Sequence, residues 1–174
     1  MTRDLVDKLA LQPHPEGGWY REIYRSPTRV ETARGSRSAI TTIYYLLERH
    51  QLSRWHIVQA DELWHFYAGA PLELLEYDPT SRKLVRHMLG YVDSVPAVGA
   101  RPDAAGAVAP ALGATSVAVI PAGVWQAARS VGEYSLVGCT VGPGFEFADF
   151  QFTSDLPSHG DHFKGDLAEF ASLL

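Results

Sequence analysis

The residues with the most chemical potential in this chain lie in one short run, Ser53 to Gly69, which reads SRWHIVQADELWHFYAG. The run contains the imidazoles of His56 and His65, the carboxylate of Glu62 and the guanidinium of Arg54. These groups can bind metal ions, move protons or hold anions. They alternate with large apolar side chains, as in strands that line a cavity with one face and pack a core with the other.

The first half of the run predicts a strand on which Arg54 and His56 share one face. If that face lines a barrel, His56 is a metal ligand or a general base; the alternative is a core histidine that is hydrogen-bonded to a neighbour. A buried arginine is costly without an anion. Arg54 is therefore expected either to clamp a phosphate or carboxylate of a ligand, or to form an internal ion pair with Glu62 or Asp61.

The second half predicts a strand on which Glu62, Trp64 and Phe66 alternate inward, although Asp61 is an alternative cavity carboxylate. Trp64 and Phe66, together with Trp125 and Phe147 further along the chain, could form the aromatic wall of a pocket suited to a sugar ring or a base. Ordinary core packing is the alternative for most of the four. His65 then lies on the opposite face, where packing or subunit contact is a better interpretation than catalysis.

Other polar residues give weaker signals. Arg21 is a second candidate anion clamp, with an exposed charge at a strand edge as the alternative. Cys139 lies in an apolar strand and is interpreted as a buried core thiol. His14 is expected on the surface or in a turn. Three tyrosines could supply a general acid, and the sequence does not choose among them: Tyr20, Tyr44 and Tyr134.

Composition places the chain among globular proteins and excludes several classes of function. It has 174 residues, of which 46% are hydrophobic and 20% charged, which fits one domain with a sizeable core. A net charge of -5 argues against a non-specific nucleic-acid or anionic-membrane partner. A single cysteine excludes an intrachain disulfide and a thiolate metal cluster. Without a long apolar run or a secretory signal, we expect a cytoplasmic protein.

Turn residues and short apolar segments predict an all-β sandwich or barrel with a short helix at each end. The helices are expected over residues 2–11 and 161–174, and a mobile surface loop over about 93–114. Residues 30–38, which are polar and contain a glycine, are expected to form a loop. The expected strands are 19–25, 38–47, 54–58, 62–67, 71–77, 83–89, 116–120, 124–128, 134–141 and 145–152.

The order of motifs resembles the cupin superfamily. His56, Glu62 and Gly69, followed downstream by Pro121-x-Gly123, match its two-motif signature. The segments HPEGGWYREIYRS, SAITTIYYLL, DELWHFYAG, IPAGVWQAAR and VGPGFEFADF are similar to a narrower cupin branch catalogued as a domain of unknown function. The resemblance implies a double-stranded β-helix, or jelly roll, as a single cupin domain over residues 1–174. It also implies a homodimer in which an early strand such as 19–25 pairs with the partner.

The resemblance implies a weakened metal site. Metal-binding cupins have a His-x-His motif and a Glu, with a further His after Pro-x-Gly. Here Arg54 stands at the first histidine position and Gln126 at the last. His56 and Glu62 match as ligands, and Gln126 could add a weak oxygen donor, so the expected cofactor is none or one divalent metal ion.

Together, these residues predict a protein that binds a small anionic, sugar-like ligand, for example a nucleotide-linked sugar. The expected reaction is epimerisation or isomerisation by proton abstraction next to a carbonyl. His56 is the base or metal ligand, Glu62 its partner, Arg54 the anion clamp and Gln126 a polar contact. Two alternatives stay open: a metal-dependent cupin oxygenase or lyase, and a non-catalytic module that binds a small ligand.

Overall fold

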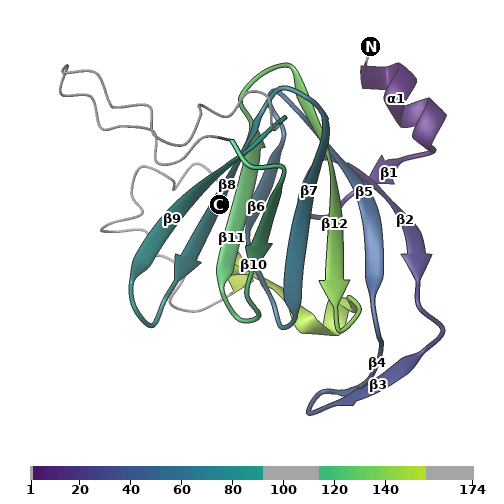
Figure 1. Ribbon diagram of the computed structural model, residues 1–174, viewed down its shortest axis with the longest axis vertical. Coiled ribbons are helices and arrows are strands. Elements are labelled where there is room, and N and C mark those ends of the chain that lie inside the picture. The colour runs from purple at the N-terminus through teal and green to yellow at the C-terminus, as the bar shows by residue number, and fades with distance from the viewer. Residues whose placement is uncertain (1, 92–113, 156–174) are drawn as a thin grey trace.

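Two antiparallel β-sheets that face each other form the body of the protein (Figure 1). This computed structural model describes residues 2–91 and 114–155. One sheet contains, in spatial order, β1 (Gln12–Pro13), β2 (Trp19–Arg25), β5 (Thr41–Glu48), β12 (Tyr134–Gly142), β7 (Asp61–Gly69) and β10 (Val117–Ile120). The other contains β13 (Phe150–Phe152), β6 (Leu52–Val58), β11 (Trp125–Ser130), β8 (Leu72–Asp78) and β9 (Lys83–Leu89). The jelly roll expected from the sequence is confirmed.

The main core lies between the two sheets. Tyr45 and Trp64 of the six-stranded sheet pack in one cluster with Leu72 and Leu74 of the five-stranded sheet. Side chains along β7 alternate between this interior and the outer surface, since Trp64 is buried whereas Tyr67 is exposed. The period of two in the sequence therefore selects which side chains face the interior.

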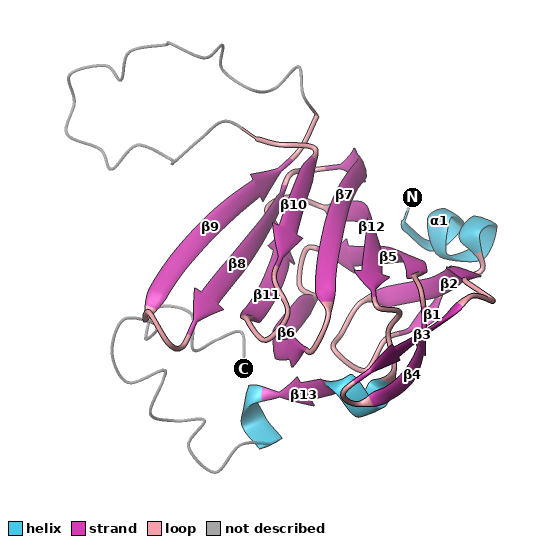
Figure 2. Ribbon diagram, turned by 60° about the horizontal axis from the view of Figure 1, so that its bottom comes forward, coloured by secondary structure: helices cyan, strands magenta, loops and turns pink. Residues whose placement is uncertain are grey.

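A second apolar cluster covers the opposite face of the five-stranded sheet. It includes Trp55 of β6, Leu75 and Tyr77 of β8, and Trp125 of β11, all of them buried. Strand β6 is thus covered on both faces, and none of its residues is exposed. Figure 2 shows the two sheets from a second direction.

Helix α1 (Thr2–Leu9) packs against the outer face of the six-stranded sheet. Leu5 and Leu9 contact a cluster that contains Leu46 and Leu136. The expected N-terminal helix is therefore confirmed, although it ends two residues early. None of the helices in the described part of the chain has the length and apolar character needed to cross a membrane.

The polar segment expected as a loop forms a β-hairpin of β3 (Arg29–Thr32) and β4 (Gly35–Ser38). The Thr32 hydroxyl donates to the carbonyl of Gly35 at 2.7 Å and accepts from the backbone N–H of Arg34 at 3.1 Å. Gly35 adopts a φ of +100°, which favours glycine. Turn chemistry, which an argument from apolar alternation overlooks, specifies this hairpin.

The segment expected as one strand over residues 145–152 is divided in two. A 3₁₀ turn, η2 (Phe147–Asp149), precedes the short strand β13, and a second turn, η3 (Thr153–Asp155), follows it. The backbone N–H of Asp149 donates to the carbonyl of Glu146 at 2.9 Å and closes the first turn. The prediction of a continuous strand was wrong because this turn, and side-chain bonds to Asp149, hold the chain in another path. The expected C-terminal helix, and all but the last residue of the expected loop over about 93–114, lie outside the described residues.

Candidate functional site

A cavity of about 150 Å³ lies inside the barrel. Its walls come from the inward faces of β2, β5, β7 and β12, and from the loop residues 14–16 and 145–147. A narrow inner space of about 10 Å³ lies between His14, Glu16 and Glu62, close to the volume that one water molecule needs. We call this the inner end of the cavity, and the region around Glu22, Arg25 and Glu146 its mouth.

Glu62 is the inner-end carboxylate carried by β7, and its side chain is held by an amide. Gln126 Nε2 donates to Glu62 Oε2 at 2.5 Å, and Trp64 Nε1 donates to Gln126 Oε1 at 3.0 Å. Because an indole N–H can only donate, the amide oxygen must face Trp64 and the amide nitrogen must face Glu62. Burial raises the pKa of Glu62 to about 6, and the nearby His56 acts against that rise.

Asp61, the alternative carboxylate, lies outside the cavity. It is exposed and accepts a hydrogen bond from the backbone N–H of Ala122 at 2.9 Å. Strand alternation turns Asp61 away as it turns Glu62 inward. Of the two adjacent carboxylates, the structure therefore places Glu62 in the cavity.

Glu16 supplies a second inner-end carboxylate, which the sequence reasoning missed. It is 8% exposed and lines the cavity. The Ser53 hydroxyl donates to Glu16 Oε2 at 2.7 Å. Burial raises the pKa of Glu16, while the neighbouring His14, the Ser53 hydroxyl and the charge of Arg54 act against the rise. The signal in the sequence was a glutamate placed directly before the Gly17–Gly18 turn.

His14 lies in a turn, one of the two positions expected for it, but its side chain also lines the cavity and is only 6% exposed. The sequence did not indicate this contribution to the cavity. The backbone N–H of Glu16 donates to His14 Nδ1 at 3.2 Å. Burial lowers the pKa of His14 below its usual value. In the neutral ring, Nδ1 accepts and the proton must lie on Nε2.

Gly17 holds this turn in place. Its φ of +113° favours glycine, and a Cβ at this position would overlap the carbonyl oxygen of Leu52. The Tyr45 hydroxyl donates to the Gly17 carbonyl at 2.8 Å. The backbone N–H of Gly17 donates to the carbonyl of His14 at 3.0 Å. The close approach of this turn to β6 places the side chains of residues 14 and 16 in the barrel.

His56 lies beside the inner-end carboxylates but does not line the cavity. It is 1% exposed, and its ring stacks on Phe150 with centroids 5.2 Å apart. Nδ1 lies 2.6 Å from the carbonyl oxygen of Arg54, so Nδ1 must carry a proton and Nε2 keeps its lone pair in the neutral ring. Burial lowers the pKa of His56, while the charge of Glu62 acts against that change.

Neither arginine expected as an anion clamp lines the cavity. Arg54 Nη2 donates to the carbonyl of Pro15 at 2.9 Å, and Arg54 Cζ lies 4.4 Å from the ring centroid of Phe152. Arg21 points to the outer face of the six-stranded sheet, with Cζ 5.9 Å from the ring centroid of Tyr44. The two guanidinium groups were expected to contact a ligand in the cavity. They instead contact a backbone carbonyl and aromatic rings outside it.

Arg25 is the arginine that lines the cavity, and its nitrogens already have partners. Nε and Nη2 donate to the two carboxylate oxygens of Glu22 at 3.0 and 2.8 Å. Nη1 donates to Glu146 Oε1 at 2.9 Å, and Nη2 also donates to the carbonyl of Phe145 at 3.1 Å. These hydrogen bonds raise the pKa of Arg25, chiefly through Glu22. At the mouth of the cavity, Arg25 is thus held between two carboxylates.

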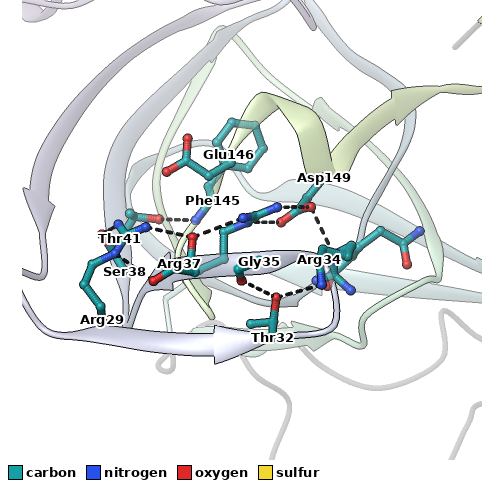
Figure 3. A network of polar contacts seen from close by, with 12 residues as sticks. Arg29, Thr32, Arg34, Gly35, Arg37, Ser38, Thr41, Phe145, Glu146 and Asp149 are labelled. Atoms are coloured by element: carbon teal, nitrogen blue, oxygen red, sulfur yellow. Dashed lines mark hydrogen bonds and ion pairs between the residues drawn. The ribbon is translucent and has the colours of Figure 1, made fainter.

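The loop that forms the mouth is tied to the β3–β4 hairpin (Figure 3). Arg37 Nε and Nη2 donate to the two carboxylate oxygens of Asp149 at 2.8 and 2.9 Å, and Arg34 Nε donates to one of them at 3.0 Å. The Arg37 guanidinium holds the pKa of Asp149 below its usual value. The Phe145 N–H donates to Thr41 Oγ1 at 2.9 Å. The hairpin that sequence reasoning missed therefore positions one wall of the cavity.

The aromatic residues expected as a pocket wall are separated by the fold. Trp64 borders the inner end, and Phe147 lies at the mouth with 56% exposure. Phe66 belongs to the main core and Trp125 to the cluster on the opposite face of its sheet. Cys139 is buried as expected, but it also lines the cavity, and burial raises the pKa of its thiol well above the usual value.

His56, Glu62 and Gln126, the ligand set implied by the resemblance, do not fit a metal ion as they stand. The Gln126 oxygen accepts from Trp64 and its nitrogen donates to Glu62, so the amide offers no free oxygen toward the carboxylate. Within residues 2–91 and 114–155, no three histidine, cysteine, aspartate or glutamate side chains converge as a metal site requires. We therefore derive no chemical step through a metal.

Comparison with known proteins gives the family and the fold. Residues 3–153 match the family model described as "Cupin superfamily (DUF985)". No curated protein matches the chain. A hypothetical protein from Leishmania major is 27% identical, with a TM-score of 0.76 over 98% of this chain and 97% of that one. Protein SO0799 from Shewanella oneidensis is 30% identical, with a TM-score of 0.73 over 95% of this chain and 93% of that one.

A more distant similarity concerns the fold alone. An oxalate decarboxylase from Bacillus subtilis is 13% identical, with a TM-score of 0.55. The match covers 93% of this chain and 36% of that chain. The shared architecture is a cupin barrel, on which many unrelated activities occur. By its family match and its fold, this chain belongs to the cupin superfamily, in the family DUF985.

Proposed function

We propose that the cavity binds a small carbonyl compound and that Glu62 moves a proton to and from the carbon next to the carbonyl. This is the chemistry of an isomerase or epimerase. One observation carries the proposal: a carboxylate with a pKa of about 6 lines the cavity and is oriented by Gln126. A general base works best when its pKa lies near the working pH.

His14 is suited to assist as a hydrogen-bond donor. When Glu62 takes the proton, the electrons of the C–H bond move toward the carbonyl oxygen, which gains negative charge. A neutral imidazole with its proton on Nε2 can donate to that oxygen and stabilise it. If a second acid delivers a proton to the other face of the same carbon, the product is an epimer. In a hydroxy aldehyde or hydroxy ketone, transfer of the hydroxyl proton to the carbonyl oxygen and return of the carbon-bound proton to the former carbonyl carbon gives an isomer.

His56 has a supporting role in this proposal. It lies outside the cavity lining, and its charge interaction with Glu62 opposes the rise in the pKa of that carboxyl. The sequence suggested His56 as the base, and we now propose Glu62 for that role. His56 becomes a positioning residue that limits how far burial raises the pKa of the carboxyl.

The cavity volume limits the size of the ligand. An engineered protein cavity of about 150 Å³ holds benzene, so the volume of about 150 Å³ found here suits one ring. Larger pockets of roughly 300 to 1,000 Å³ are usual for drug-sized ligands. A sugar-sized ring fits, whereas the nucleotide part of a nucleotide-linked sugar would have to lie outside the cavity.

Proton exchange with solvent tests the proposal directly. Small cyclic and acyclic carbonyl compounds are first screened for binding by thermal shift, and those that bind are incubated with the protein in D₂O. NMR should show deuterium entering at the carbon next to the carbonyl. The Glu62→Gln variant should bind the same compounds and lose the exchange. Equal exchange in wild type and variant would contradict the role of Glu62.

The two alternatives are separated by simple outcomes. Binding without any exchange, abolished by substitutions in the cavity, supports a non-catalytic binding module. Stoichiometric Fe, Mn, Ni or Zn in freshly purified protein supports a metal-dependent oxygenase or lyase. In that case, we expect the Gln126 amide to turn away from Trp64 and offer its oxygen to the metal, which a crystal structure of the metal-bound protein would show.

A homodimer remains part of the proposal. Strand β1 pairs with only the first two residues of β2, at Trp19 and Tyr20, so the rest of that strand edge is suited to pairing with a second copy. The outer face of the same sheet also carries exposed Val117 and Val119. Light scattering coupled to size-exclusion chromatography measures the mass directly, and a monomeric mass at all concentrations would exclude this assembly.

A further inference from the structure

We propose that the cavity selects a single-ring molecule that carries a positive charge, such as an organic ammonium ion, over an anion of the same size. This inference rests on the proposed function only in taking the cavity as the ligand site. It reverses the charge that the sequence led us to expect for the ligand.

The charges around the cavity carry the argument. Among the residues that the structure describes, the charged side chains lining it are four glutamates, Glu16 and Glu62 at the inner end and Glu22 and Glu146 at the mouth, together with Arg25. Each nitrogen of the Arg25 guanidinium already donates to Glu22, Glu146 or a backbone carbonyl. An entering anion would therefore meet carboxylates without a free guanidinium in the lining, whereas a cation is attracted by them.

The other arginines near the cavity also have partners. Arg34 and Arg37 bind Asp149, and Arg54 donates to the carbonyl of Pro15. None of these three side chains lines the cavity. Their charges are therefore not available for direct contact with a bound anion.

The walls of the mouth are suited to a cation with an apolar ring. Phe145 and Phe147 line this part of the cavity, and their rings lie edge to face with centroids 5.1 Å apart. Tyr20 also lines the cavity, beside His14. Aromatic faces attract cations and exclude water from them. Glu146 uses Oε1 for Arg25, so its Oε2 can accept a hydrogen bond from an ammonium group.

Three compounds of similar size and different charge test the proposal. Benzylamine is a cation, benzyl alcohol is neutral and benzoate is an anion at about pH 7.5. Their affinities for the wild-type protein are measured by titration calorimetry or ligand-observed NMR. We expect benzylamine to bind at least about tenfold more tightly than benzoate, with benzyl alcohol between them. Equal or tighter binding of benzoate would overturn the proposal, and so would failure of all three to bind at millimolar concentration.

A double variant tests whether the mouth carboxylates set the preference. Glu22→Gln combined with Glu146→Gln keeps the side-chain length, removes two negative charges and leaves the positive charge of Arg25 without a carboxylate at these two positions. We expect benzylamine to lose affinity and benzoate to gain it. Near-ultraviolet circular dichroism and the melting temperature establish that the variant is folded. A folded variant that keeps the wild-type preference would overturn the assignment to these carboxylates.

Glu133→Gln provides the matched control. Glu133 is exposed and directly precedes β12, whereas Phe145 and Glu146 follow the opposite end of that strand. The same chemical change at this distance should leave all three affinities unchanged. Because these experiments measure only binding, they are independent of turnover. Absence of proton exchange in the wild-type protein, with the charge preference present, would count against the proposed function alone. Exchange in the wild-type protein without the charge preference would count against this inference alone.

Discussion

The glutamates at the two ends of the cavity differ in burial and in their partners. At the inner end, Glu16 and Glu62 are buried and accept hydrogen bonds from a neutral hydroxyl and a neutral amide, and burial raises the pKa of both. At the mouth, Glu22 and Glu146 are about 40% exposed and bind Arg25. With a pKa of about 6, Glu62 can therefore change protonation near neutral pH. Under the two proposals made above, the same residue type would serve proton transfer at one end and charge selection at the other.

The substitution Gly17→Ala should break the inner end with the largest effect. The new Cβ would overlap the Leu52 carbonyl at a φ of +113°, so we expect a loss of about 3 kcal/mol in the free energy of unfolding. Urea denaturation measures it. Gly35→Ala is the matched control, because its φ of +100° is similar but its Cβ would meet only the flexible Arg37 side chain. Equal losses in the two variants would show that the close approach to β6 is unimportant.

The raised pKa of Glu62 at the inner end should make the free energy of unfolding depend on pH. Its pKa rises from 4.5 in the unfolded chain to about 6 in the folded protein, so the folded state binds more protons between these values. The free energy of unfolding should therefore fall by about 2 kcal/mol as the pH rises through this window.

The Glu62→Gln variant should lose that part of the pH dependence and be more stable than wild type above the window. Glu16 also has a raised pKa, so the difference between wild type and variant isolates Glu62. Denaturation curves at several pH values measure the difference. Parallel curves for the two proteins would contradict the raised pKa.

The substitution Asp149→Asn should loosen the mouth without disturbing the inner end. It removes the charge that holds Arg34 and Arg37, so the loop over residues 145–149 should lose protection from amide hydrogen exchange. Amides of β7 beside Glu62 should keep their protection. Asp78→Asn is the control, because Asp78 ends β8 and its carboxylate accepts from Thr80 in the turn that follows. Unchanged exchange at Phe145 and Asp149 would show that the hairpin does not hold this wall.

The smallest stability effect is expected for Glu146→Gln. The ion pair with Arg25 is partly exposed, and Arg25 keeps its two bonds to Glu22. We expect the free energy of unfolding to change by at most about 0.5 kcal/mol. Thermal or urea denaturation measures this. A loss as large as that of Gly17→Ala would mean that the mouth carries structure as well as charge.

Local signals explain how much of the fold could be predicted. Strand β9 covers the expected residues 83–89, because the Asp78 side chain closes the turn before it by accepting from Thr80 and Ser81. The alternation of side chains along β7 correctly predicted that Glu62 points inward, like Trp64. The β3–β4 hairpin escaped prediction because its strands are polar and lack apolar alternation.

The rest of the site depends on contacts that are distant in sequence. His14 and Glu16 lie in a turn, where alternation does not indicate a direction, and their burial follows from the approach of that turn to β6. Arg25 and Glu146 are 121 positions apart, so only the closed barrel shows that they bind each other. The sequence therefore predicted that Glu62 faces the interior of the barrel, but it did not predict which charged residues meet at the mouth.

Cys139 gives the wild-type chain a reporter of its own cavity occupancy. It is the only cysteine in the sequence, it lines the cavity, and burial suppresses formation of its thiolate. Alkylation by iodoacetamide needs the thiolate, so its rate should follow how often the barrel opens to reagent and solvent. A molecule seated between the two ends should slow that rate in proportion to the fraction of sites filled. Competition kinetics at one native atom can thus rank unknown ligands without a label, a variant or an assay of turnover.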